Sequence, residues 1–309
     1  MHGQLRSRLL WVTVLATARS SPAGGRGGPP PARLSELPGS GAEQLPSTPA
    51  RCPVTDAPGT SEQVPVRVLG GPTTLIESGG LRFLTDPTFD APGKYPLGGG
   101  RSLTKTAPSA VDPADLGTLD AVLLSHDQHP DNLDGSGRAL LADVPVVLTT
   151  RSAAGRLAGT TRGLAPWEAV ELPRPDGGTV TVTATPARHG PEGCEPVTGE
   201  VVGFVLTAAD LPTVHVSGDN ASLDVVREIA GRVGPVDTAV LFAGAARTAL
   251  FDGALLTIDG ARAAEAAALL GARRVVPAHC DSWAHFSETR DDVVTAFTAA
   301  GIADRLQPG

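Results

Sequence analysis

Four of the seven histidines in this 309-residue chain come just after apolar, strand-like runs. Two of them follow the run at 121–125, one follows 180–185 and one follows 273–277; they are His126, His129, His189 and His279. A further run, 213–217, ends two residues before Asp219. Strand ends are where α/β folds present reactive groups, because the sheet fixes the backbone while the side chain enters a loop crevice. Imidazoles and a carboxylate delivered in this way from distant parts of the chain are what a divalent metal site needs.

The first 63 residues differ in composition from the remaining 246. They hold 9 Pro and 8 Gly, which is 17 of 63 residues and typical of low-complexity sequence that stays unfolded. Residues 64–309 are long enough to bury a substantial core, and their composition is that of ordinary globular protein. We therefore expect a disordered extension over 1–63 and a single domain over 64–309.

Along 64–309 the pattern changes from a strand meander to an alternation of strands and helices. Three short strands are expected at 66–69, 73–77 and 81–85, followed by a loop-like stretch at 86–116 that is long enough to cover a site. Later strands are expected at 119–125, 144–149, 178–185, 201–207, 213–217, 236–242 and 273–276, and helices at 133–143, 151–158, 221–233, 260–270 and 288–300. In the last helix, Val293, Val294 and Phe297 are expected to face inward. One mixed α/β domain accounts for this order.

The charge of the chain argues against nucleic acid and anionic membranes as partners. The whole chain carries −8; residues 1–63 hold six Arg and four acidic residues, which leaves 19 basic and 29 acidic residues, or −10, in 64–309. Contacts to a phosphate backbone need clustered Lys and Arg. No run of 18 apolar residues occurs, so no integral membrane segment is expected. The expected partner is a small-molecule substrate, and a homo-oligomer is compatible with the sequence.

The location of the protein in the cell has two interpretations. The three cysteines show neither a metal-type spacing nor a disulfide framework, which favours a reduced, cytoplasmic environment; they are Cys52, Cys194 and Cys280. Residues 6–18 form a weak signal-like segment, because Arg6 and Arg8 precede the ten-residue apolar run 9–18. We favour an unstructured extension on a cytoplasmic protein, and the alternative is export directed by this segment.

The densest polar segment lies at 126–134, where two imidazoles and three carboxylates occupy nine positions. A lone loop histidine is usually structural, but two histidines with one aspartate between them and another after them are typical of metal ligation. No G-x-S-x-G, P-loop or G-x-G-x-x-G motif competes with this segment, and the triple glycine at 98–100 is interpreted as a flexible loop. The sequence therefore predicts a metal centre.

The segment 126–132 resembles the His-x-His-x-Asp-His signature of the metallo-β-lactamase superfamily. Three later segments resemble, in order, the third histidine, the bridging aspartate and the last histidine of that family; they are 186–191, 217–219 and 276–279. The segments 84–87, 125–127 and 279–286 look most like the branch that includes ascorbate-6-phosphate lactonase and its bacterial relatives. The resemblance implies an α/β fold, a four-layer αβ/βα sandwich of two mixed sheets flanked by helices, with the metal cleft at one edge.

The resemblance also implies which residues bind metal. His126, His129 and His189 would form the first metal position. Asp131 and His279 would form the second, with Asp219 bridging the two. The expected cofactor is Zn²⁺, as one or two ions, with Mn²⁺ or Fe as alternatives.

Two departures from the family signature affect this ligand set. His129 falls one residue later than the second family histidine, and Asn132 stands where the family has the last histidine of its signature. An amide oxygen is a much weaker zinc ligand than an imidazole nitrogen, so the second metal position is expected to be weak, altered or empty. Asn132 is interpreted either as a ligand or as the N-cap of a helix that starts at Leu133.

The expected function is that of a metal-dependent hydrolase, in which a metal-bound hydroxide attacks a small ester, lactone or phosphorylated metabolite. Asp127 and Asp131 are candidate catalytic residues; Asp127 is interpreted as a proton shuttle, as an acceptor that orients a ligand imidazole, or equally as a structural hydrogen-bond acceptor. Two alternatives remain: a phosphodiesterase, as the resemblance to N-acylphosphatidylethanolamine-hydrolysing phospholipase D allows, and a non-catalytic binding protein with a degenerate second metal position. His285 is expected to pack in a Trp/His/Phe corner, with contact to the substrate as the alternative, and His215 is expected to be structural.

Overall fold

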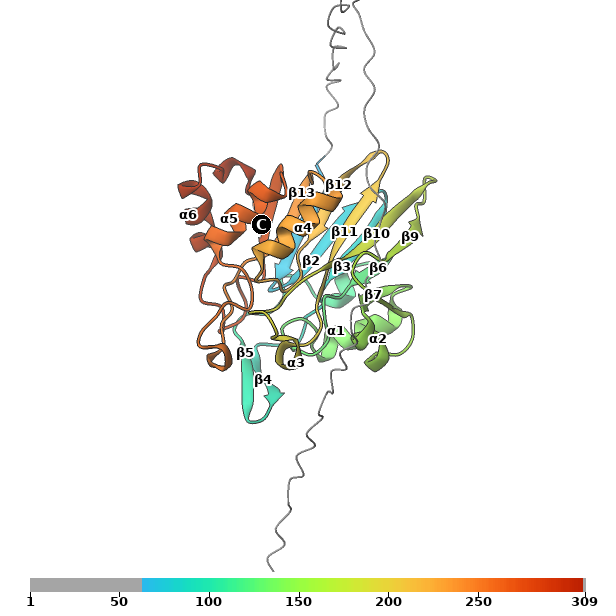
Figure 1. Ribbon diagram of the computed structural model, residues 1–309. Helices are drawn as coiled ribbons and strands as arrows, with labels where there is room; N and C mark the ends of the chain where they lie inside the picture. The colour runs from blue at the N-terminus through green and yellow to red at the C-terminus, as the bar shows by residue number, and fades with distance from the viewer. Residues whose placement is uncertain (1–62, 308–309) are drawn as a thin grey trace, which may run out of the picture. The chain divides into compact units, whose positions relative to one another are not determined.

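The computed structural model describes residues 63–307, so the predicted signal-like segment 6–18 and all but the last residue of the predicted extension 1–63 lie outside the described residues. Two six-stranded sheets form the body of the fold (Figure 1). The first sheet has the order β1 (Val66–Gly70), β2 (Thr73–Ser78), β3 (Leu81–Thr85), β6 (Ala121–Leu123), β7 (Val147–Thr150), β8 (Thr161–Leu164). The second has the order β14 (Arg274–Ala278), β13 (Thr238–Phe242), β12 (Leu211–Val216), β11 (Val202–Ala208), β10 (Thr179–Pro186), β9 (Ala169–Pro173).

Both sheets are mixed, because each contains an antiparallel meander and a parallel part. Strands β1 to β3 are antiparallel, and β3, β6, β7 and β8 are parallel. In the second sheet β9 to β12 are antiparallel, and β12, β13 and β14 are parallel. Strands β10, β12 and β14 therefore run in the same direction and end at the same edge of their sheet.

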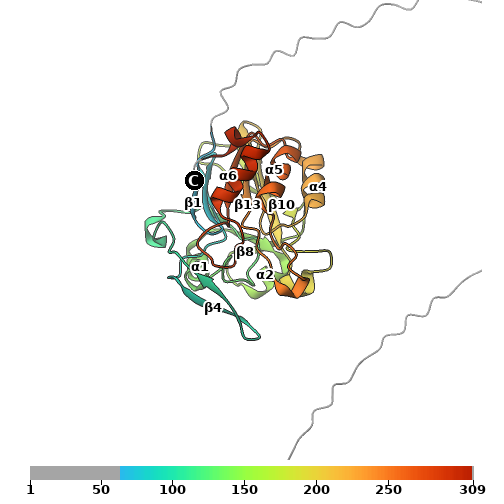
Figure 2. The same cartoon turned by 90° about the vertical axis from the view of Figure 1, so that its left-hand side faces the viewer.

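The two sheets pack face to face and are covered by helices on their outer faces (Figures 1 and 2). Side chains from both sheets, Phe83 and Phe204 among them, form the core between the sheets. Helices α1 (Gly135–Leu140) and α2 (Arg151–Arg156) lie on the first sheet, where Ala153 of α2 is buried. Helices α4 (Leu223–Val233), α5 (Gly260–Leu269) and α6 (Arg290–Ala299) lie on the second. The predicted four-layer α/β sandwich of two mixed sheets is confirmed.

Short helices complete the fold, namely α3 (Glu195–Thr198) and the 3-10 turns η1 (Pro113–Asp115), η2 (Leu141–Asp143), η3 (Ala249–Phe251) and η4 (Ala303–Arg305). In α6 Val293 and Phe297 are buried, as predicted, but Val294 is 40% exposed. The prediction for Val294 was wrong because neighbouring helical residues point about 100° apart, and the buried face of α6 is only wide enough for every third or fourth residue. Within residues 63–307, no helix combines the length and the apolar character that crossing a membrane requires.

The stretch 86–116, predicted as a loop, contains a β-hairpin made of β4 (Gly93–Gly98) and β5 (Arg101–Lys105). Its turn uses three glycines, 98–100, all with positive φ, which a chain of L-residues adopts only at a cost. The prediction missed the hairpin because its strands alternate between half-buried and exposed residues and therefore lack an apolar run. The hairpin projects from the body at the end where α1 and α2 lie (Figure 2). The sequence also gave no sign of the short, half-exposed strands β8 and β9.

A buried ion pair fixes the base of this hairpin to the first sheet's helices. The Lys105 ammonium donates to the Asp134 carboxylate at 3.3 Å and to the Thr88 carbonyl at 3.0 Å, with 2% and 0% of the two charged side chains exposed. The other Asp134 oxygen caps α1 by accepting from the Gly137 amide at 2.8 Å. The helix N-cap and the hairpin therefore depend on one carboxylate.

Replacing Lys105 by Ala should lower the free energy of unfolding by about 3–5 kcal/mol, because it leaves the Asp134 charge buried without its partner. Urea unfolding monitored by circular dichroism measures this loss. Arg227→Ala is the matched control, because its ion pairs with Asp224 and Glu265 are exposed and worth less than about 1 kcal/mol. Similar losses in the two variants would contradict a structural role for the buried pair.

Candidate metal centre

The polar strand-end residues meet at the edge where the two sheets end together. Ser125 and His126 follow β6, His189 follows β10, and Asp219 follows β12. The backbone is forced into a tight turn before Asp219: Gly218 has φ +57°, and a Cβ atom there would lie 2.5 Å from the Val202 carbonyl oxygen. Glycine is therefore required at 218 to aim Asp219 at the cluster.

Four side chains form a first donor cluster, made of His126, His129, His189 and Asp219. One nitrogen or oxygen from each of them can be chosen so that all four atoms lie within 4.8 Å of one another. The His126 Nε2 and His129 Nδ1 atoms are 2.9 Å apart, and His189 Nε2 lies 3.5 Å from an Asp219 oxygen. Three imidazoles and one carboxylate at this spacing are a donor set for zinc, iron or manganese.

Hydrogen bonds outside the cluster orient two of these imidazoles. His189 Nδ1 lies 2.9 Å from the Leu256 carbonyl oxygen, which can only accept, so this nitrogen carries the proton and Nε2 presents its lone pair to the cluster. His126 Nδ1 contacts the Ser125 hydroxyl at 3.0 Å, which leaves its Nε2 toward His129. An imidazole anchored through its outer nitrogen in this way is the usual arrangement for a metal ligand.

The environment keeps His126 and His129 neutral. Burial, together with the neighbouring imidazole of His129, lowers the pKa of His126 well below its usual value. Burial and the nearby His189 lower the pKa of His129 to about 4. Neutral imidazole is the form that binds metal, so no proton has to be displaced from these two rings at neutral pH.

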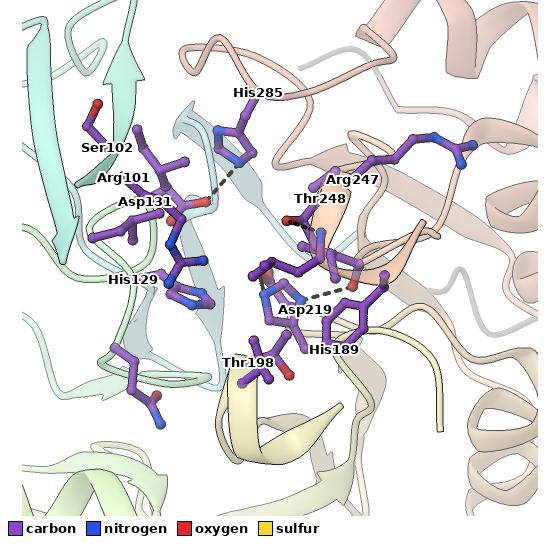
Figure 3. A pocket seen from close by; sticks show the side chains of 18 residues that line it. Arg101, Ser102, His129, Asp131, His189, Thr198, Asp219, Arg247, Thr248 and His285 are labelled. Carbon is purple, nitrogen blue, oxygen red and sulfur yellow. Dashed lines mark hydrogen bonds and ion pairs between the residues drawn. The ribbon is translucent and has the colours of Figure 1, made fainter. Parts of the chain in front are cut away.

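A second donor cluster adjoins the first and shares Asp219 with it. One nitrogen of His279 lies 3.2 Å from an Asp219 oxygen, and the other lies 3.3 Å from an Asp131 oxygen. The same Asp131 oxygen lies 3.1 Å from His285 Nε2. His285 was predicted to pack in an aromatic corner; it does contact Phe286, with ring centroids 4.3 Å apart, but its ring also faces the cluster (Figure 3). The signal that could have revealed it is the close sequence spacing of His279 and His285.

Buried polar atoms without partners test whether these residues fit a metal. The Oδ1 atoms of Asp131 and Asn132 are buried and make no hydrogen bond, and both ring nitrogens of His279 are within ion-pair distance of carboxylates but outside hydrogen-bond geometry. Burial alone would lower the pKa of His279, but Asp219 and Asp131 raise it to about 10. The two buried carboxylates therefore need a positive charge beside them. When no metal is bound, a proton on His279 supplies this charge. The donor set therefore fits one or two divalent cations.

Asn132 points into the space between the clusters and does not cap a helix. Its Nδ2 atom donates to Asp219 at 3.3 Å and to the Ser125 hydroxyl at 3.5 Å. The first helix after it begins at Gly135 and is capped by Asp134. The N-cap interpretation of Asn132 was wrong, because the turn that follows His129 delays the helix by two residues.

Asp127, the candidate proton shuttle, points away from the clusters. Both of its oxygens accept from the Arg156 guanidinium of α2, with Nε at 3.0 Å, and only 3% of the side chain is exposed. A carboxylate held in this way does not face the other candidate residues, so the structure disfavours Asp127 as a shuttle. The other candidate catalytic residue, Asp131, lies at the second cluster.

Asp86 supports the clusters from beneath. Its side chain is 1% exposed, and one oxygen accepts from the Ser125 amide at 2.6 Å, which fixes the backbone just before His126. Burial raises the pKa of this carboxyl group well above its usual value.

His215, predicted to be structural, is buried in β12, where Nδ1 contacts the Phe204 carbonyl at 3.2 Å.

Part of the two clusters lines a cavity of about 450 Å³, namely His129, Asp131, His189, Asp219 and His285 (Figure 3). Its walls are mostly apolar and come from the β4–β5 hairpin, from α3 and from the segment around η3; they include Leu97, Leu103, Val197, Leu250, Phe251 and Leu256. Two arginines belong to the wall, and Figure 3 shows Arg101 directed into the cavity, on the side of His129, and Arg247 directed away. Arg247 donates to the Gly253 carbonyl at 2.8 Å, whereas Arg101 makes no ion pair or side-chain hydrogen bond with residues 63–307.

Comparison with known proteins agrees with this geometry. The family described as "Beta-lactamase superfamily domain" matches residues 81–280. A UPF0173 metal-dependent hydrolase from Nitratidesulfovibrio vulgaris is 30% identical over 218 residues, which are 66% of this chain and 74% of the relative.

Two solved structures share the fold at low sequence identity. An isothiocyanate hydrolase from Delia radicum gut bacteria has a TM-score of 0.66 at 22% identity, covering 79% of this chain and 96% of its own. A protein from Veillonella parvula, described as a possible metal-dependent hydrolase, has a TM-score of 0.67 at 18% identity, covering 79% and 95%. At these identities the likeness extends to the fold alone.

Adding Zn²⁺ to chelator-treated protein should raise the free energy of unfolding by about 2.7 kcal/mol when the free ion is at 100 times its Kd. His189→Ala should lose this increment, because it removes one of four donors from the first cluster. Urea unfolding with and without the ion measures both values. His215→Gln is the control: it removes a buried histidine outside the clusters and should keep the increment, and loss of the increment in both variants would contradict the assignment.

Proposed function

We propose, from the premise that this chain belongs to the metallo-β-lactamase superfamily and is a metal-dependent hydrolase, that it cleaves a small ester, lactone or phosphorylated metabolite that carries a negative charge. The observation that carries the proposal is the cavity above the two clusters, with apolar walls and one inward-pointing arginine. A volume of about 450 Å³ is in the range of pockets that enclose a small molecule.

The donor residues are well placed for hydrolysis. His126, His129, His189 and Asp219 would hold one ion, and Asp131 and His279 would hold a second that shares Asp219. A divalent ion supplies Lewis-acid activation of water and of the bond to be broken. Asp219 lies between the two groups of imidazoles and is 1% exposed, so its charge is directed at the clusters instead of at solvent.

A side-chain nucleophile has no support among the described residues. The hydroxyl groups that line the cavity belong to Ser102, Thr198 and Thr248, and none of them hydrogen-bonds to an imidazole that could act as its base. Cys280 is 3% exposed, and burial raises its pKa to about 12, so it is a neutral thiol at physiological pH. Water is therefore the nucleophile in the proposed reaction.

Arg101 supports a negatively charged substrate. Its guanidinium points into the cavity from the hairpin and has no acidic partner within residues 63–307. A guanidinium beside an apolar wall recognises a carboxylate or a phosphate while the rest of the ligand contacts the leucines. The Arg101 guanidinium would also bind a phosphodiester, so the phosphodiesterase remains the second candidate function. The substrate panel below distinguishes the two.

A substrate panel tests the reaction class. We expect metal-loaded protein to hydrolyse γ-lactones or carboxylic esters faster than bis-p-nitrophenyl phosphate, and the reverse order would favour the phosphodiesterase. His189→Ala should lower kcat/KM by more than about 100-fold, the upper end of the effect of residues that only support a ligand. Equal rates in the wild type and in this variant would instead indicate a binding protein without catalysis.

Arg101→Ala should lower kcat/KM about 10- to 100-fold for an ester with a free carboxylate, because a hydrogen bond to a charged group contributes about 1.5–3 kcal/mol. The pair 4-nitrophenyl hydrogen succinate and 4-nitrophenyl butyrate compares a charged with a neutral ester of similar length. The neutral ester should be hydrolysed equally by wild type and variant. Arg247→Ala is the matched control, because the Arg247 side chain points away from the cavity. If Arg101→Ala lowered kcat/KM equally for both esters, the role of Arg101 would be contradicted.

A further inference from the structure

The second donor cluster lacks one imidazole that the family signature supplies. The residue after Asp131 is Asn132, and its Nδ2 amide group, a hydrogen-bond donor, faces Asp219 at 3.3 Å. A donor N–H cannot bind a cation, and the amide oxygen on the other side is a weak ligand for a transition metal. Without another residue, the second position would rest on His279 and two carboxylates.

His285 brings an imidazole to this position from another part of the chain. It lies in the loop after β14, and its Nε2 atom is 3.1 Å from the same Asp131 oxygen that lies 3.3 Å from His279 Nε2. The side chain is 20% exposed and belongs to the cavity wall, so it is open toward the cavity. Figure 3 shows its ring turned toward Asp131.

The loop that carries His285 is held on both sides. At its start, the His279 amide donates to the Gly71 carbonyl and the Gly71 amide donates to Asp281, both at 2.7 Å. At its centre, the Thr106 amide donates to the Ser282 carbonyl at 2.8 Å, and the Ala284 amide donates to the Thr104 carbonyl at 2.9 Å. These bonds form an isolated antiparallel bridge between Lys105 and Trp283, so the loop is anchored to the hairpin just before His285.

Aromatic packing fixes the ring itself. Phe286 lies against both imidazoles, with centroids 4.3 Å from His285 and 4.6 Å from His279. Trp283, on the other side, is 4% exposed. The Nδ1 atom of His285 is buried and makes no hydrogen bond, so no partner within residues 63–307 turns the ring away from Asp131.

We propose that His285 replaces the imidazole that is missing at Asn132 and completes, with Asp131 and His279, the donor set of a second metal ion. The inference rests on the metal centre proposed above. With His285 as a ligand, the protein would bind two metal ions although its signature segment lacks one histidine. The converging atoms are His279 Nε2, His285 Nε2 and one Asp131 oxygen, and two imidazoles with one carboxylate suit a divalent transition metal.

Metal stoichiometry tests the proposal without reference to activity. The full-length protein is stripped with a chelator, titrated with Co²⁺, and followed by visible absorption and by mass spectrometry of bound metal. The wild type should bind two equivalents. His285→Ala should bind one equivalent with unchanged affinity and the second at least about 100-fold more weakly, since it loses a ligand and not merely a supporting residue. Near-UV circular dichroism confirms that the variant is folded.

A rescue variant separates ligation from mere packing. Asn132→His in the His285→Ala background returns an imidazole to the cluster from the position of the family signature, and it should restore the second equivalent. Phe286→Leu is the loop control: it alters the packing beside His285 but no donor atom, and it should keep both equivalents. If Phe286→Leu lost the second equivalent of Co²⁺, and Asn132→His did not restore it in the His285→Ala background, loop packing and not ligation by His285 would support the second ion.

The outcomes distinguish this proposal from the function it rests on. Two equivalents in both the wild type and His285→Ala would overturn the role of His285 and leave the metal centre intact. One equivalent in both proteins would do the same, because no second ion would then exist. A wild type that binds no Co²⁺ would overturn the metal centre itself, and the role of His285 with it.

Discussion

The burial of two carboxylates within one cluster of histidines is the constraint on which the rest of the site depends. Asp219 is 1% exposed and Asp131 3% exposed, and both face His279, whose pKa they raise to about 10 although burial alone would lower it. Charges taken out of water in this way need a compensating charge nearby. His126 and His129 are poorly suited to supply it, because burial lowers the pKa of both. A divalent cation satisfies both requirements, since it binds neutral imidazoles and neutralises carboxylates.

The scaffold meets this constraint by ending several strands at one edge and tying the loops there to each other. The hairpin of β4 and β5 is fixed below by the Lys105–Asp134 pair, and its base is hydrogen-bonded to the loop that carries His285. The inward-pointing Arg101 starts the second strand of the same hairpin. Arg101, which would recognise the charge of a substrate, and His285, which would bind metal, are therefore held by the same hairpin and the loop hydrogen-bonded to it.

The sequence was sufficient to predict the fold and the residues that follow apolar strands. It was not sufficient where the role of a residue depends on the direction of its side chain. His126, His189, Asp219 and His279 were predicted to lie at one site because each follows an apolar strand, and the structure brings them together. The hairpin was missed because an exposed ribbon has no apolar run. Asp127 was placed at the site because it adjoins His126 in sequence, yet its carboxylate turns to Arg156. His285 was assigned to packing because aromatic neighbours surround it; its spacing from His279 hints at the cluster, but its contact with Asp131, more than 150 positions earlier in the chain, needs the fold.

The two departures from the family signature follow from a single local change in the backbone. The wider spacing of His126 and His129 places a turn after His129, whose carbonyl accepts from the amides of Asn132 and Leu133 at 3.1 and 3.0 Å. This turn sets Asn132 beside Asp219, where an amide N–H stabilises the carboxylate without competing for a cation. The altered spacing and the asparagine are thus consistent with each other, and His285 approaches Asp131 from a different part of the chain.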